Sequence, residues 1–157
     1  MNTKLLLATL VLLSGLTQPA LAAQQGVWGC PAMYSATTTH VVGAVIRVWN
    51  WSDGGTLAIQ EISIFDNSGT PRPVTFSPVE LGPHQETAFV VRNLLGLPLT
   101  PATNVNVRGI QVIVKWRAIG GAQPLAEVSW NVNSRDPSTL AMTALTGTDT
   151  RKCYDLK

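Results

Sequence analysis

Apolar and polar residues alternate along most of the chain after residue 36, and this is the period of a β-strand rather than of a helix. Strands are expected over 37–51, 56–65, 86–92, 109–118 and 125–134. Turn-forming residues separate these segments. The pattern predicts an all-β domain built as a two-sheet antiparallel sandwich of roughly six to eight strands.

The clearest pairing in the sequence is a hairpin that joins 109–118 to 125–134. If Trp116 lies opposite Trp130, one face of this hairpin is apolar throughout and the other carries the charged residues. A shift by one residue would mix the two faces, so the pattern favours this register.

Two further segments give weaker signals. The segment 93–106 is expected to be a long loop, since it is rich in Leu, Pro and Thr and shows no strand period. The tail after Asp136 is expected to form one last strand before Cys153.

The first 22 residues have the pattern of a signal peptide. A single lysine, Lys4, precedes an apolar run over 5–16 that is short for a membrane span. The small residues of Ala20-Leu21-Ala22 then predict cleavage after Ala22. We therefore expect one mature domain over 23–157, which is exported to the periplasm or cell exterior and does not insert into a membrane.

The only two cysteines, Cys30 and Cys153, lie near the ends of the mature chain. In an exported protein a disulfide between them is the default expectation. The alternative is a lipoprotein cleavage box ending in an acylated Cys30. Trp28 is bulky for such a box and Cys153 would stay unpaired, so the disulfide is favoured, with Trp28 packed over it.

Charge and composition narrow the range of partners. The chain has a formal net charge of +2, which falls to +1 without Lys4, and only 13% of its residues are charged. A surface with so little net charge does not favour the binding of nucleic acid. We expect a protein or a glycan as the partner, and no cofactor.

The sequence shows no recognisable catalytic or metal-binding motif. His40 and His84 lie in different segments, no Gly-x-Ser-x-Gly elbow is present, and no His, Cys and carboxylate cluster has metal-ligand spacing. Glu61 and Glu127 lie on expected strands, so an unrecognised carboxylate pair stays open as an alternative. Four further acidic residues lie in turn-like sequence, namely Asp53, Asp66, Asp136 and Asp149.

The candidate ligand-binding residues are Arg47, Trp49 and Trp51. The two indoles are two positions apart at the end of a strand, so they point to the same side, which also carries Arg47. They are interpreted either as a stacking platform or as anchors buried beneath the next turn. Asn50-Trp51-Ser52 also matches a glycosylation sequon, which is a chance match if the signal peptide is bacterial.

The strand and turn spacing from Val48 to Gly69, followed by the Leu81–Gln85 turn, resembles the immunoglobulin-like plan of exported bacterial modules. It is also similar to the small sandwich of sensory-rhodopsin transducers. The spacing of Cys30 and Cys153 departs from the immunoglobulin pattern, where the bridge joins two central strands. The resemblance implies a fold and no particular activity.

Three hypotheses for function follow. The first is a non-catalytic exported module that acts by binding or by structural association. The second is a carbohydrate-binding module that uses Trp49 and Trp51. The third is a subunit of a surface fibre or assembly that pairs through a sheet edge.

Overall fold

The computed structural model describes residues 23–97, 105–139 and 141–156. The expected signal peptide and half of the expected loop over 93–106, namely 98–104, lie outside these ranges. The described residues form ten antiparallel strands and one short helix, which confirms the all-β prediction. The elements are β1 Gln24–Ala36, β2 His40–Asn50, β3 Thr56–Phe65, β4 Pro71–Arg72, β5 Val79–Leu81, β6 Glu86–Val90, α1 Val91–Leu94, β7 Val105–Ile119, β8 Pro124–Arg135, β9 Met142–Lys152 and β10 Tyr154–Leu156.

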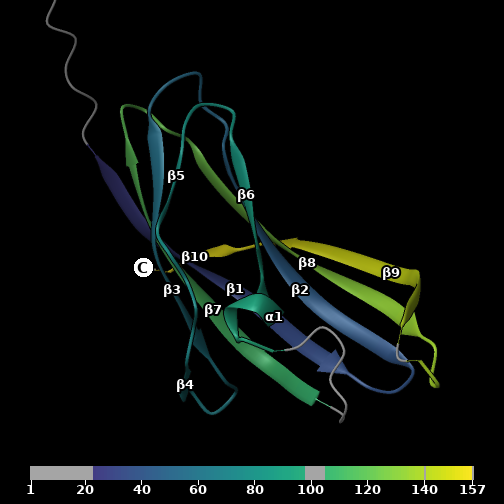
Figure 1. Cartoon of the computed structure of the whole chain (residues 1–157). Coiled ribbons are helices and arrows are strands. Elements are labelled where there is room, and N and C mark those ends of the chain that lie inside the picture. The colour runs from purple at the N-terminus through teal and green to yellow at the C-terminus, as the bar shows by residue number, and fades with distance from the viewer. Residues whose placement is uncertain (1–22, 98–104, 140, 157) are drawn as a thin grey trace, which may run out of the picture.

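Backbone pairing links all ten strands into one sheet with two halves (Figure 1). One half has the order β3-β7-β1, and the short strands β4, β5 and β10 pair at its edges. The other half has the order β6-β2-β8-β9. The halves are joined where residues 34–36 of β1 pair with residues 41–43 of β2.

Both halves contribute to one hydrophobic core. Alternate residues of β2 are fully buried, namely Ala44, Ile46 and Val48, because the period of a strand turns every second side chain inward. They share a cluster with the buried residues of β3 and β7 from the other half. The two halves therefore pack face to face as the layers of a sandwich, continuous through the β1–β2 hairpin.

The number of strands is larger than the six to eight expected. Three of the additional strands, β4, β5 and β10, have only two or three residues, too few to show an alternating pattern. The longest one missed is β1, whose glycines and proline interrupt the apolar period. By contrast, β3 has the predicted bounds of 56–65.

The predicted hairpin between β7 and β8 is wrong. β7 pairs with β1 and β3, whereas β8 pairs with β2 and β9, so the chain crosses between the halves after Ile119. Trp116 lies opposite Gly26 and Ile59 instead of Trp130. The alternation of apolar and polar residues specifies which face of each strand is buried, but it does not specify which strand is the neighbour. Two buried faces can meet across the core of a sandwich as well as lie side by side in one sheet.

The tryptophans assigned to the core do pack there. Trp28 and Trp116 are buried and stack with ring centroids 5.1 Å apart. Trp130 packs partly buried against the same cluster, with the Arg151 guanidinium 5.2 Å from its ring. Trp28 also belongs to the cluster that contains Cys30.

The predicted disulfide between Cys30 and Cys153 is confirmed. It joins the middle of β1 to the residue between β9 and β10, 123 positions away, with the Cα atoms 4.6 Å apart. Because its sulfur is in this bond, Cys30 is not the acylated cysteine of a lipoprotein. A buried disulfide indicates an oxidising environment outside the cytoplasm. In the described ranges, no helix has the length and apolar character needed to cross a membrane.

Candidate functional site

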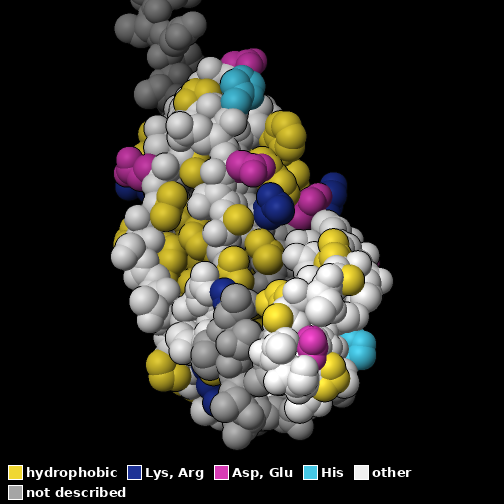
Figure 2. Space-filling view, turned by 45° about the vertical axis from the view of Figure 1, so that its right-hand side comes forward, with side chains coloured by type: hydrophobic (Ala, Val, Ile, Leu, Met, Phe, Trp, Pro, Cys, Tyr) yellow, Lys and Arg dark blue, Asp and Glu magenta, His cyan; other side chains and the backbone are white. Residues whose placement is uncertain are grey.

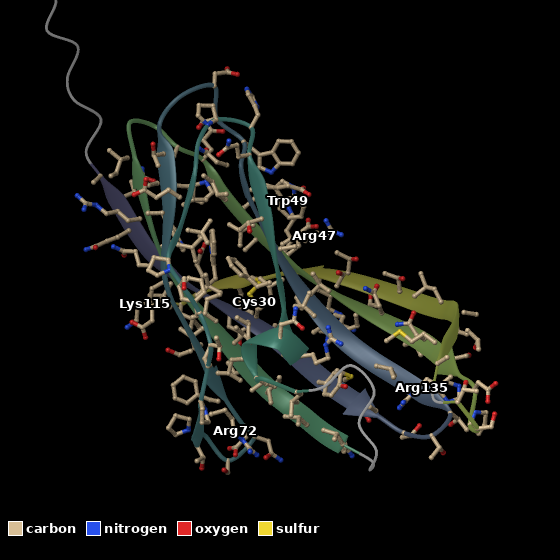
Figure 3. The ribbon with its side chains drawn as sticks, in the orientation of Figure 1. Cys30, Arg47, Trp49, Arg72, Lys115 and Arg135 are labelled. Carbon is tan, nitrogen blue, oxygen red and sulfur yellow. A yellow bond between two sulfur atoms is a disulfide. The ribbon has the colours of Figure 1, made fainter. Side chains whose placement is uncertain are left out.

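The outer face of the β2-β8-β9 half carries the side chains that the main core does not use, apart from Val41, which is buried in a small second cluster with Tyr34 and Ala36. On β2 the residues that alternate with the buried ones are Gly43, Val45, Arg47 and Trp49. Figure 3 shows Arg47 and Trp49 pointing outward from β2, on the side away from Cys30. The strand therefore presents these two side chains on a rigid, hydrogen-bonded support.

Trp49 is held in a fixed orientation by β6. Pairing of β2 with β6 places Trp49 opposite Glu86, and the indole Nε1–H donates a hydrogen bond to the Glu86 carboxylate. The other oxygen of Glu86 lies 3.5 Å from the Arg47 guanidinium. Trp51 stacks on Trp49 with ring centroids 6.3 Å apart and an interplanar angle of 23°. Trp51 is 57% exposed, whereas Trp49 is half-buried.

A hollow of about 420 Å³ lies beside Trp49, and we call it the Trp49 hollow. Three neighbouring strands contribute to it, because β2-β8 and β8-β9 pairing puts their outward side chains side by side. Trp51 is not part of its wall. The lining residues are Arg47, Trp49, Glu127, Ser129, Asn131, Thr148 and Thr150.

A second hollow of about 130 Å³ continues along the same face, and we call it the Gly43 hollow. Asn131 lines both hollows, so they are neighbours on one surface. A Cβ atom placed on Gly43 would have no atom within 4 Å, which shows that this glycine leaves open space. The lining residues are Tyr34, Val41, Gly43, Ala44, Val45, Val90, Arg92, Asn131, Asn133 and Met142.

The two hollows differ in charge. In the Trp49 hollow, Arg47 is balanced by Glu86 and lies opposite Glu127 across the β2-β8 ladder. In the Gly43 hollow, Arg92 forms no salt bridge with a carboxylate of the described residues, and its Nη2 donates to the neutral Asn93 side chain at 2.8 Å. Burial raises the pKa of the Tyr34 phenol, against the opposing influence of Arg92 and Arg135. The end of the groove near Tyr34 is therefore the more positive one.

The sequence identified Arg47, Trp49 and Trp51 but not the rest of this face. The structure brings Arg47 and Trp49 into one hollow and leaves Trp51 stacked at its margin. The polar residues of β8 alternate with its core residues, which marks them as outward-facing. Their place beside β2 depends on strand pairing, which the alternation does not specify.

The remaining polar candidates lie apart from each other. Glu61 is on β3, in the opposite half from Glu127, and the ammonium of Lys115 lies 2.7 Å from its carboxylate. The hydrogen bonds from Lys115 and Ser63 hold the pKa of Glu61 below its usual range. Both histidines are exposed: His84 lies 3.0 Å from Asp53, and His40 contacts Thr39. Across 23–97, 105–139 and 141–156, no three His, Cys, Asp or Glu residues are grouped as metal ligands.

The sequon residue Asn50 has a structural role. Its side chain is 1% exposed, and its amide donates to the carbonyl oxygens of Leu81 at 3.2 Å and Gly82 at 3.1 Å. Its Oδ1 accepts hydrogen bonds from Ser52 and from the backbone N–H of Gln123. A buried amide with these partners has no free group for a glycan, so the sequon is a chance match.

A further hollow, of about 350 Å³, lies on the other half of the sheet, beside Lys115 and Trp116. Its tryptophan is only 8% exposed and stacks on Trp28, so it offers a ligand no free aromatic face. Figure 2 shows charged side chains of opposite sign next to each other, among hydrophobic and uncharged polar surface, on the face it displays. The outer face of β2-β8-β9 is the better candidate, since it combines an accessible tryptophan with hydrogen-bonding side chains.

Comparison with known proteins gives little likeness. No protein-family model matches the chain, and no curated protein sequence matches it either. A solved structure described as the crystal structure of Thermotoga maritima 1070 is similar over 82% of this chain and 92% of its own, with 14% identity and a TM-score of 0.45.

Proposed function

We propose that this chain is an exported, non-catalytic binding module that takes a carbohydrate into the Trp49 hollow. Export through a signal peptide over 1–22 and an immunoglobulin-like plan of the sandwich are parts of the same proposal. The observation that carries it is the position of Trp49, which is fixed by Glu86 and stands beside a wall of hydroxyl and amide groups.

The chemistry of this hollow matches that of a sugar. A sugar ring has an apolar face that packs on an aromatic ring, and its rim carries hydroxyl groups that both donate and accept hydrogen bonds. Ser129, Thr148 and Thr150 offer hydroxyls, Asn131 offers an amide, and Glu127 offers acceptor oxygens. Ligand sites commonly combine an apolar surface with a few polar groups that fix orientation.

The test is glycan binding by the mature chain from Ala23, first on a glycan array and then by isothermal titration calorimetry. Trp49→Ala is expected to weaken binding at least tenfold. The matched control is Trp51→Ala, since Trp51 is stacked on Trp49 but does not line the hollow, and its effect is expected to be smaller. Binding that survives Trp49→Ala unchanged, in a variant with a normal thermal transition, rejects the proposal.

The absence of catalysis is tested on the same ligand. Long incubation of the bound glycan with the protein is expected to yield no cleavage products by chromatography. A specific turnover that disappears in Glu127→Gln or in Glu61→Gln would replace the binding module with an enzyme.

A second candidate function, assembly with further copies, is favoured by the edge of the sheet. β9 runs for 11 residues and, in the described part of the chain, pairs with β8 alone. Its backbone groups on the outer side can accept a strand of a second copy. Chemical cross-linking and size-exclusion chromatography at high concentration test this, and a strict monomer argues against it. A proline in place of a β9 residue whose backbone N–H faces away from β8 removes a donor from this edge and is expected to reduce any assembly observed.

A further inference from the structure

The Trp49 and Gly43 hollows form one groove, and we propose that it binds a linear acidic oligosaccharide lengthwise, with a carboxylate at Arg92 and a sugar ring against Trp49. This inference rests on the proposed function and specifies the ligand of the same face. It goes beyond that function in two ways, since it requires a chain of several sugars and an acidic group at one end.

The Trp49 and Gly43 hollows are neighbours on the outer face of the sheet. Asn131 on β8 lines both hollows, so the two hollows adjoin each other on one face of the sheet and an extended ligand can contact both. Trp49 and Gly43 are six positions apart on β2, and a strand of that length spans roughly 20 Å. A groove of this length accommodates several sugar units in a row, whereas a disaccharide would fill only part of it.

The backbone of Gly43 has open space above it. A glycine within a strand weakens it, because it has no side chain to pack, and it often marks a place where another molecule approaches the backbone. Here a Cβ would contact nothing within 4 Å, so the protein itself does not require the glycine for packing. The missing side chain lowers the floor of the groove between Val45 and Val41.

The two ends of the groove differ in charge. Arg47 is compensated by Glu86 and faces Glu127, so the Trp49 end offers no net attraction for an anion. Arg92 has no carboxylate partner in the described ranges, and both it and Arg135 lie close enough to influence Tyr34. A guanidinium without a carboxylate favours an acidic group on the ligand. Asn131, opposite Gly43 and shared by both hollows, offers an uncharged amide that can hydrogen-bond hydroxyl groups of a sugar.

The experiment uses oligomers of galacturonic acid and of mannuronic acid, from dimer to hexamer, each also as its methyl ester. Affinities are measured by calorimetry with the mature chain. The hexamer of one acid is expected to bind at least tenfold more tightly than its dimer and than its own methyl ester. The ester keeps the sugar and removes only the charge, so it isolates the contribution of the carboxylate.

Substitutions at Arg92 and at Gly43 test the charge and the open space of the groove. Arg92→Gln is expected to bring the affinity of the acid down to that of the ester, whereas Arg72→Gln, on β4 in the other half of the sheet, leaves the difference unchanged. Gly43→Leu is expected to weaken hexamer binding at least tenfold and dimer binding little, with Gly43→Ala between. Gly43→Ala is expected to melt no lower than the wild type, since a Cβ there meets no atom within 4 Å, and Gly43→Leu is compared as folded protein with a cooperative thermal transition.

The outcomes separate this inference from the proposed function. If glycans bind in a Trp49-dependent way but acid and ester, or dimer and hexamer, bind equally, the acidic lengthwise ligand is rejected and the carbohydrate module stands. If Arg92→Gln and Gly43→Leu leave hexamer binding unchanged, the groove is likewise rejected. If no neutral or acidic glycan binds at all, both proposals fail.

Discussion

The Oδ1 atom of Asn50 accepts a hydrogen bond from the backbone N–H of Gln123 at 3.2 Å, across 73 positions of sequence. The same side chain bonds the carbonyls of Leu81 and Gly82. One buried amide thus connects the end of β2 with two distant turns, directly behind the Trp49–Trp51 pair.

Replacement of Asn50 by alanine is expected to lower the free energy of unfolding by about 2–4 kcal/mol, because several buried backbone groups would lose their partner. Urea unfolding of Asn50→Ala measures this. Asn67→Ala, at an exposed turn position, is the control and is expected to have a much smaller effect. A wild-type midpoint for Asn50→Ala would show that water replaces the amide at no cost.

Loss of the disulfide is expected to destabilise the domain strongly. The bridge closes a loop of 123 positions, and the chain-entropy model gives about 4–5 kcal/mol for a loop of this size. Denaturation of the double variant Cys30→Ala/Cys153→Ala, compared with wild type before and after reduction, measures the loss. Equal stability of the oxidised and reduced wild type would contradict a structural role for the bond.

Two glycines with the same backbone angle separate steric from conformational effects. Gly55 and Gly69 both have φ of +80°, but a Cβ on Gly55 would overlap the carbonyl oxygen of Ile119, whereas one on Gly69 would meet nothing within 4 Å. Gly69→Ala is expected to cost about 1–2 kcal/mol from the left-handed conformation alone. Gly55→Ala is expected to cost clearly more, and similar losses would mean that the 52–55 turn moves freely away from Ile119.

The stability of the domain is expected to fall in acid because of two turn aspartates. The Ser68 hydroxyl and Thr70 N–H hold the pKa of Asp66 below its usual range, and the Ser138 side chain and backbone do the same for Asp136. A lowered pKa in the folded state means that the stabilisation is present above the unfolded pKa and is lost as the pH falls through the folded one. The loss therefore begins below about pH 4.

The double variant Asp66→Asn/Asp136→Asn tests this origin. Asparagine keeps a side-chain acceptor in the turn but carries no charge and cannot titrate, so the variant is expected to be less stable than wild type at neutral pH and to lose less stability between neutral pH and acid. Thermal melting at a series of pH values provides the comparison. Parallel curves for the two proteins would place the acid sensitivity elsewhere.

Glu86 is expected to control ligand affinity through Trp49. Glu86→Ala removes the acceptor of the indole N–H and the partner of Arg47, so Trp49 gains rotational freedom. Glycan affinity is expected to fall by about tenfold, which corresponds to about 1.4 kcal/mol, with little change in melting temperature because the pair is half-exposed. Glu80→Ala, on β5 in the other half, is the control. An unchanged affinity would mean that stacking with Trp51 alone fixes Trp49.

The part of the candidate site that lies on a single strand could be predicted from the sequence. Arg47 and Trp49 could be assigned to one face from their spacing, and that face does point away from the core. Thr148 and Thr150 could not be added to it, because β9 reaches the groove only through its pairing with β8, and a register shift after Val132 changes which of its residues face outward. Spacing also places Gly43 on this face, but the open space above it could not be predicted, because such space exists only in three dimensions.

The sequence by itself determined the all-β class, the turns, the bounds of β3 and the disulfide. These follow from local chemistry, namely the two-residue period, turn-forming residues and the only two cysteines. Tertiary structure alone decided that β7 and β8 separate into different halves, that Asn50 connects distant turns, and that three strands share one groove. Each of these depends on which apolar faces meet, and many pairings of alternating strands bury the same residues equally well.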